Sequence, residues 1–280
     1  MILCWLLLYG IRRIQGKPGW PPLVLCIGIL LLKREDWAPG LMALGLLMLI
    51  TSALDWMQRR NKVSRKIATV AALLLGPAWI AMAWNWSAVV HTSRRPSLLN
   101  DRPIICTGDS LSVNGYPRVL EKRLRVPVID QAQGGINTNE GIRRLPELLA
   151  LKPQAVVIEL GGHDSLQGRS RKDTKENLAK MIRAVREAGA EVFLFEIPRG
   201  FVMDPYGGLE RELAREYDLE LITDGAIRQL VLFSPFMPIG SWTGRILSYD
   251  GLHPNDAGNE FLADRVEGAL RRVYGDALRR

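Results

Sequence analysis

The stretch PIICTGDSL, residues 103–111, has the form of a short apolar strand that runs into a tight turn. Pro103–Thr107 predicts the strand, and Gly108 predicts the turn. Ser110 then follows the strand directly, at the edge of a sheet, where a neighbouring base can activate its hydroxyl as a nucleophile. By itself the tripeptide Gly-Asp-Ser is a common turn, so its meaning depends on the rest of the chain.

Apolar strand patterns and helical patterns alternate through residues 91–280. The predicted strands are Pro103–Thr107, Val126–Ile129, Ala155–Leu160, Glu191–Ile197 and Leu219–Ile222. The predicted helices are Tyr116–Leu124, Asn139–Leu151, Asp173–Ala188, Gly208–Tyr217 and Asp256–Tyr274, with a capping box from Asp173 to Glu176 and a helix end at Gly189. This alternation predicts a parallel sheet with helices on both faces. Such a sheet places its functional site at the carboxyl ends of its strands.

Three further polar or glycine-rich clusters lie at those strand ends. Gly134 and Gly135 follow the second strand, His163 follows the third, and Asp250–Pro254 precedes the last helix. Paired glycines let the backbone approach a ligand closely. The chain contains three histidines, at positions 91, 163 and 253, and two of them fall within these clusters.

Asp250 and His253 are three residues apart at a helix entrance, where their side chains can face each other. The carboxylate can then hold one imidazole nitrogen while the other nitrogen takes a proton from a hydroxyl. Cys106 lies inside the first strand and is interpreted as a small core residue.

With these clusters, the chain from Ile104 to Tyr274 resembles the SGNH (GDSL) hydrolase family, especially its compact bacterial arylesterase, thioesterase and lysophospholipase branch. The family's four sequence blocks are matched in order by Gly108–Leu111, Asp130–Gly141, Gly161–Asp164 and Asp250–Pro254. The resemblance covers about 170 residues and leaves the first 90 outside it.

The resemblance implies a three-layer α/β/α flavodoxin-like domain and the hydrolysis of carboxylic esters through an acyl-serine. Ser110 would attack the ester carbonyl, His253 would take the serine proton, and Asp250 would orient His253. The backbone N–H groups of Ser110 and Gly135, together with the side chain of His163, would form the oxyanion hole. This chemistry needs no metal and no organic cofactor.

One position departs from the family pattern. His163 stands where the family has an asparagine whose side chain donates to the oxyanion. A neutral imidazole has one N–H that can donate in its place. We interpret His163 as a working substitute, and weakened activity is the alternative.

The positive charge of the chain is concentrated before residue 91. The 280 residues carry 37 Lys and Arg against 29 Asp and Glu, a net charge of +8. Residues 1–90 hold 10 basic and 3 acidic residues, whereas residues 91–280 hold 27 and 26. A nucleic-acid-binding protein carries its basic surplus on the folded domain. The distribution therefore argues against a nucleic-acid partner.

The first 90 residues contain three long uncharged runs, Pro18–Leu32, Trp37–Leu54 and Ile67–Val90. About 20 apolar residues cross a bilayer. We therefore predict a membrane anchor of about three transmembrane helices in residues 1–90, a linker at 91–102 and the hydrolase domain at 103–280. The basic loop at residues 59–66 should remain in the cytoplasm, which places the catalytic domain outside the cytoplasmic membrane. A buried apolar helical bundle and a cleaved signal peptide, with processing at Ala81–Ala83, are the competing interpretations.

The sequence leaves three hypotheses for function. The first is a membrane-anchored serine esterase that acts on lipids, lysophospholipids or O-acetylated glycans. The second is an O-acyltransferase or acetyltransferase for envelope glycans. The third is a catalytically weakened scaffold, against which the presence of Ser110, Asp250 and His253 argues.

Overall fold

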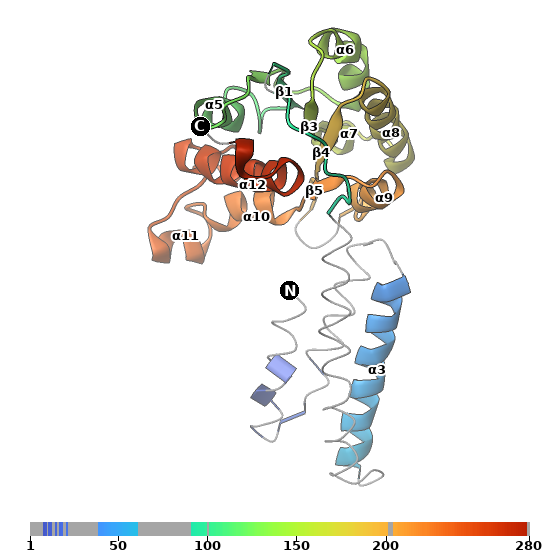
Figure 1. The fold of residues 1–280 in the computed structure, drawn as a ribbon. Helices are drawn as coiled ribbons and strands as arrows, with labels where there is room; N and C mark the ends of the chain where they lie inside the picture. Colours follow the sequence, from blue (N-terminus) through green and yellow to red (C-terminus); the bar gives the residue numbers. More distant parts are fainter. Residues whose placement is uncertain are drawn as a thin grey trace. The chain divides into compact units, whose positions relative to one another are not determined.

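The structure is a computed structural model that describes residues 8–9, 11–12, 15, 17–18, 21, 39–60, 91–99, 101–200 and 204–278 (Figure 1). The chain divides into two compact units. One consists of Met1–Val89 and Val202–Gly207, and the other of Val90–Phe201 and Gly208–Arg280.

A five-stranded parallel sheet forms the centre of the larger unit, with the strand order β2-β1-β3-β4-β5. The strands are β1 (Ile104–Gly108), β2 (Val128–Asp130), β3 (Ala155–Glu159), β4 (Glu191–Phe195) and β5 (Glu220–Ile222). This is the flavodoxin-like order, in which the chain reverses direction across the sheet beside β1. The predicted parallel α/β fold is therefore confirmed, with every predicted strand present within two residues of its predicted bounds.

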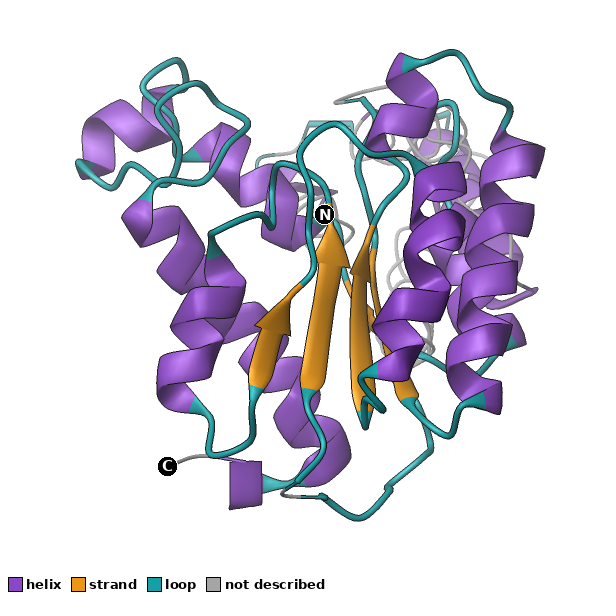
Figure 2. Ribbon diagram, turned by 90° about the horizontal axis from the view of Figure 1, so that it is seen from above, coloured by secondary structure: helices purple, strands orange, loops and turns teal. Residues whose placement is uncertain are grey.

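Helices cover both faces of the sheet (Figure 2). One layer contains α5 (Tyr116–Arg123), α10 (Gly225–Leu232) and α12 (Asp256–Tyr274), and the other contains α6 (Thr138–Ala150), α8 (Arg171–Glu187) and α9 (Leu209–Glu216). Short helices α7 (Gly162–Leu166) and α11 (Pro238–Thr243) and the 3-10 helix η1 (Asp276–Leu278) complete the unit. Both faces of β1, β3 and β4 are buried, which explains their continuous apolar sequences.

The predicted capping box at Asp173 and Glu176 is wrong. Helix α8 begins two residues earlier, and its N-cap is Ser170, whose hydroxyl accepts from the Asp173 amide at 3.0 Å. A complete capping box occurs instead at α6, between Asn137 and Glu140. The predicted end of α8 is correct, since Gly189 has φ +79° directly after the helix.

Residues 91–99, which are part of the predicted linker 91–102, belong to the larger unit and form hydrogen bonds to its strands. His91 Nδ1 lies 2.9 Å from a carboxylate oxygen of Glu220, at the start of β5. Arg94 Nε donates to Glu191 at 2.9 Å, at the start of β4. This segment therefore lies along the amino ends of these strands, at the edge of the sheet opposite to the predicted site.

The smaller unit contains the helix α3 (Pro39–Arg59), which overlaps the predicted span Trp37–Leu54. Its last turns hold an ion pair between Asp55 and Arg59 at 3.6 Å. Ile67–Val90 and nearly all of Pro18–Leu32 lie outside the described residues, as do most of the basic loop and the candidate processing site. Within the part of the chain that is described, no helix combines the length and the apolar character needed to cross a membrane.

Candidate active site

Ser110 lies in the turn that follows β1, at the carboxyl edge of the sheet. The carbonyl oxygen of Asp109 accepts from the amides of Ser112 and Val113, each at 3.2 Å, which closes the turn. The side chain of Asp109 also bonds the amide of Leu111 at 3.0 Å. These contacts fix the backbone on both sides of Ser110 and leave its side chain partly exposed.

The structure brings Ser110, His253 and Asp250 into one hydrogen-bonded chain. Ser110 Oγ lies 3.0 Å from His253 Nε2, and His253 Nδ1 lies 2.7 Å from Asp250 Oδ2. Ser110 is separated from His253 by 143 positions in the sequence, and the sheet brings the two together. The arrangement is that of a nucleophile, a base and an orienting carboxylate.

Asp250 is held in place by its second oxygen. Oδ1 accepts from the amide of His253 at 2.7 Å, the amide of Leu252 at 2.8 Å and the hydroxyl of Ser248 at 2.9 Å. The hydrogen bond from the His253 side chain, helped by these donors, holds the pKa of Asp250 well below its usual range. The carboxylate is therefore ionised at any pH at which an esterase works. The role of Ser248 was not predicted, because a lone serine two residues before an aspartate has no distinctive pattern.

The loop with Gly134 and Gly135 runs beside the nucleophile turn. Gln131 N donates to Cys106 O at 2.8 Å, and Gln133 N donates to Gly108 O at 3.0 Å, so the pairing with β1 continues beyond β2. A side chain at Gly134 would come within 3.9 Å of Ser110 Cβ. Gly135 has φ +82°, a conformation that suits glycine. The loop thus lies directly beside the turn that carries Ser110.

His163 lies in the first turn of α7, after Gly161, whose φ is +116°. Its side chain is one-quarter exposed, and its Nε2 lies 3.8 Å from Asp109 Oδ2. The neighbouring Asp164 points inward instead, and accepts from the amide of Thr138 at 2.9 Å and from its hydroxyl at 2.5 Å. Asp164 therefore ties α7 to the start of α6, and His163 remains at the site with Asp109.

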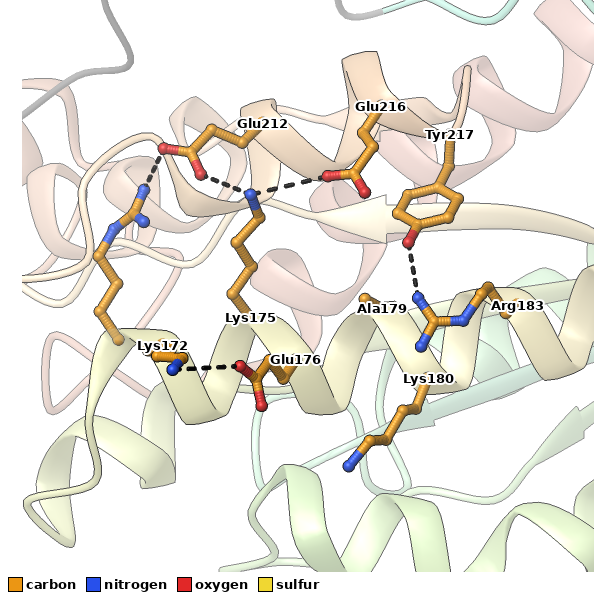
Figure 3. Close-up of a pocket in the computed structure, with 10 residues that line it drawn as sticks. Lys172, Lys175, Glu176, Ala179, Lys180, Arg183, Glu212, Glu216 and Tyr217 are labelled. Carbon is orange, nitrogen blue, oxygen red and sulfur yellow. Dashed lines mark hydrogen bonds and ion pairs between the residues drawn. The ribbon is translucent and has the colours of Figure 1, made fainter.

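A cavity of about 740 Å³ lies elsewhere, between α8 and α9 (Figure 3). Several of its charged side chains pair with each other, as in the contacts of Glu212 with Arg171 at 2.5 Å and with Lys175 at 2.9 Å. Ser110, Asp250 and His253 are not part of its lining. Among the described residues, no group of His, Cys, Asp and Glu side chains is arranged to hold a metal ion.

Comparison with known proteins identifies the family. The model of the GDSL-like lipase/acylhydrolase family matches residues 105–261, more than half of the chain. The chain belongs to this family. The matched region includes Ser110, His163 and His253, and the family assignment makes the protein a carboxylic ester hydrolase of the GDSL type.

Characterised members of the GDSL family resemble this chain over its catalytic part. Thioesterase 1/protease 1/lysophospholipase L1 of Escherichia coli is 28% identical over 183 residues, which cover 60% of this chain and 83% of that protein. Esterase TesA of Pseudomonas aeruginosa is 32% identical over 185 residues, covering 60% and 87%. The structure of the psychrotrophic esterase EstA from Pseudoalteromonas sp. superposes with a TM-score of 0.51 at 21% identity, covering 61% of this chain and 98% of that one, which shows a shared fold.

Proposed function

We propose that this GDSL-family hydrolase cleaves carboxylic esters through an acyl-enzyme on Ser110. The hydrogen-bonded chain from Ser110 through His253 to Asp250 is the observation that carries the proposal. His253 Nε2 takes the proton as Ser110 Oγ bonds to the carbonyl carbon, and then gives it to the leaving alcohol. Water then attacks the acyl-serine, with His253 again the base, and releases the acid and free Ser110.

The oxyanion hole is proposed to consist of the backbone N–H groups of Ser110 and Gly135 and the side chain of His163. The Gly134-Gly135 loop adjoins Ser110. The His163 side chain lies beside that of Asp109, the residue before Ser110. Donors at these positions stabilise the negative charge that develops on the carbonyl oxygen in the transition state.

Covalent labelling tests the acyl-enzyme. The full chain, in mild detergent, should be inactivated by a fluorophosphonate with loss of fluoride and one phosphonyl group gained per molecule. Peptide mass analysis should place the group on Ser110. Turnover of p-nitrophenyl esters that continues without any labelling of Ser110 would contradict the mechanism.

His163 provides a second prediction. His163→Ala removes the proposed side-chain donor and should lower kcat by about 100- to 1,000-fold with little change in KM. His163→Asn, measured beside it on the same ester, tells whether the site is built around imidazole. A lower kcat in the His163→Asn variant fits a working histidine, whereas a much higher kcat identifies His163 as a weakening substitution. Full activity in the His163→Ala variant would exclude His163 from the oxyanion hole.

The substrate is proposed to carry an apolar acyl or alcohol group. Three large apolar side chains lie exposed around the catalytic loop: Phe236, Tyr249 and Leu252, with exposures of 73%, 72% and 50%. The ring of Phe236 lies against Gly251, between the two catalytic residues of that loop. Exposed apolar surface beside a catalytic group favours a lipid-like ester over a small polar one.

Chain-length selectivity tests this substrate class. Phe236→Ser should lower kcat/KM for a long-chain p-nitrophenyl ester by about tenfold, since burying a large apolar side chain is worth about 1.5–3 kcal/mol. The same variant should leave the acetate ester nearly unaffected. Leu151→Ser, at an exposed apolar position after α6, is the matched control. Equal losses on both esters would argue against an apolar subsite.

The location of the enzyme is also a proposal. The three uncharged runs and the basic loop of residues 1–90 support a membrane anchor with the catalytic domain on the outer face. In spheroplasts the domain should be digested by added protease, and in inverted vesicles it should be protected. The opposite pattern would reverse the orientation, and recovery of the full chain in the soluble fraction would rule out the anchor.

A further inference from the structure

A buried carboxyl group lies directly behind the nucleophile turn. Glu159 is the last residue of β3 and pairs in register with Gly108, the last residue of β1. Its side chain is almost completely buried, with 1% of the residue exposed. None of the steps of ester cleavage uses this group, and burying a carboxyl is costly unless it is bonded.

Glu159 Oε2 holds the nucleophile turn from both sides of Ser110. It accepts from the amide of Asp109 at 3.2 Å and from the hydroxyl of Ser112 at 3.0 Å. A Cβ atom at Gly108 would lie 2.7 Å from this oxygen and 2.5 Å from Ser112 Oγ. The glycine that opens the turn is thus required because the Glu159 carboxyl and the Ser112 hydroxyl occupy the space beside it.

The second oxygen of the Glu159 carboxyl, Oε1, is buried and has no hydrogen-bond partner among the described residues. Burial raises the pKa of Glu159 well above its usual range, and the negative charge of Asp109 raises it further. Burial also raises the pKa of Asp109, but the amide of Leu111 and the nearby His163 oppose that rise. Burial therefore favours the neutral form of Glu159, while Asp109 faces His163, whose Nε2 lies 3.8 Å from Asp109 Oδ2.

We propose that Glu159 is a positioning residue for the nucleophile and the oxyanion hole. By bonding the amide of Asp109 and the hydroxyl of Ser112, it keeps Ser110 Oγ directed at His253 and sets the direction of the Ser110 N–H. It does so as a neutral carboxylic acid, since burial disfavours its charged form. The inference rests on the proposed role of Ser110.

Two substitutions show whether Glu159 positions the nucleophile turn through its hydrogen bonds or only fills space behind it. Glu159→Gln keeps the shape and retains an oxygen acceptor for both donors, so kcat should remain within about threefold of wild type. Glu159→Ala removes the acceptor, and the displaced turn should lower kcat by about 100-fold with KM within about twofold, since a misplacement of about 1 Å has a cost of that order. Ser112→Ala, which removes only one of the two donors, is the matched control and should fall between them.

Thermal unfolding of the full chain against pH tests the protonation state. If Glu159 is neutral when folded, wild type takes up a proton on folding above the ordinary pKa of a glutamate, about 4.3. The stability of wild type is then lost as pH rises. Relative to Glu159→Gln, the unfolding equilibrium constant of wild type should increase about tenfold for each pH unit. The melting temperature of the variant should therefore rise relative to wild type between pH 5 and pH 8.

Each outcome decides the proposal. A Glu159→Gln variant as inactive as Glu159→Ala, or a melting-temperature difference that does not change with pH, would overturn it. If Glu159→Ala does not fold, the activity and pH trend of Glu159→Gln still decide. Absence of Ser110-dependent labelling in wild type would overturn the proposed function instead, while the pH trend would still report the protonation of Glu159.

Discussion

Replacing Ser110 with alanine is expected to nearly abolish ester turnover, leaving only the small residual rate that the oxyanion hole supports. Without Oγ there is no atom to form the acyl-enzyme, and His253 Nε2 loses the hydroxyl that lies 3.0 Å from it. Removing the nucleophile of a serine hydrolase costs about 10⁶-fold in kcat. The fold should be unaffected, because the Ser110 side chain is partly exposed and, among the described residues, hydrogen-bonds only to His253.

The measurement is kcat for short-chain and long-chain p-nitrophenyl esters with the purified full chain. Ser97→Ala, an exposed serine of the segment before β1, serves as the matched control and should retain wild-type activity. Circular dichroism should be the same for all three proteins. Turnover by the Ser110→Ala variant within tenfold of wild type would exclude Ser110 as the nucleophile.

The fold was predictable because its central strands are buried on both faces. Such strands have largely apolar sequences, as in Ala155–Ile158, and the helices between them show clear periodicity. The short helices α7 and α11 were not predicted, since α7 consists of five residues inside a glycine-rich loop and α11 of six. The first residue of a helix is harder to predict than the helix itself, because several neighbouring polar residues can serve as the N-cap. The sequence therefore predicts an N-cap at Asp173, whereas Ser170 occupies that position.

Those residues of the candidate site that directly follow a strand could be predicted from the sequence. Parallel strands bring their carboxyl ends to one edge, so Ser110, Gly135 and His163 had to be neighbours. The supporting contacts could not be predicted in the same way. Glu159 gave a signal, a carboxyl at the end of an otherwise apolar strand, but its partners depend on the register of β1 against β3.

Many charged residues of the larger unit lie in ion pairs. Residues 91–280 are nearly neutral in sum, yet many of their charges form ion pairs, such as Arg211 with Glu196 at 2.6 Å and Arg272 with Glu220 at 2.5 Å. Paired charges leave little free potential for an anionic polymer. The absence of a nucleic-acid partner stays a prediction from the charge balance of the sequence.

Asp250→Asn is expected to have the second largest effect, a fall in kcat of about 10⁴-fold with a nearly unchanged structure. Asp250 Oδ1 accepts from two backbone amides, and an asparagine oxygen would keep that position. The amide nitrogen of the new side chain would then face His253 Nδ1, which lies 2.7 Å from Oδ2 in the wild type. An N–H that donates to Nδ1 forces the ring proton onto Nε2, and Nε2 can then no longer accept the proton of Ser110.

The kinetics of the Asp250→Asn variant separate this tautomer effect from a loss of loop structure. Ser248→Ala removes one of the three donors to Oδ1 while leaving the carboxylate and both amides, so it should cost about tenfold in kcat, the low end of the scale for one hydrogen bond to a charged group. If Ser248→Ala and Asp250→Asn lose activity equally, the carboxylate serves mainly to brace the loop. If Asp250→Asn alone loses several orders of magnitude, and fluorophosphonate labelling of Ser110 slows in parallel, Asp250 acts through the orientation and tautomer of His253.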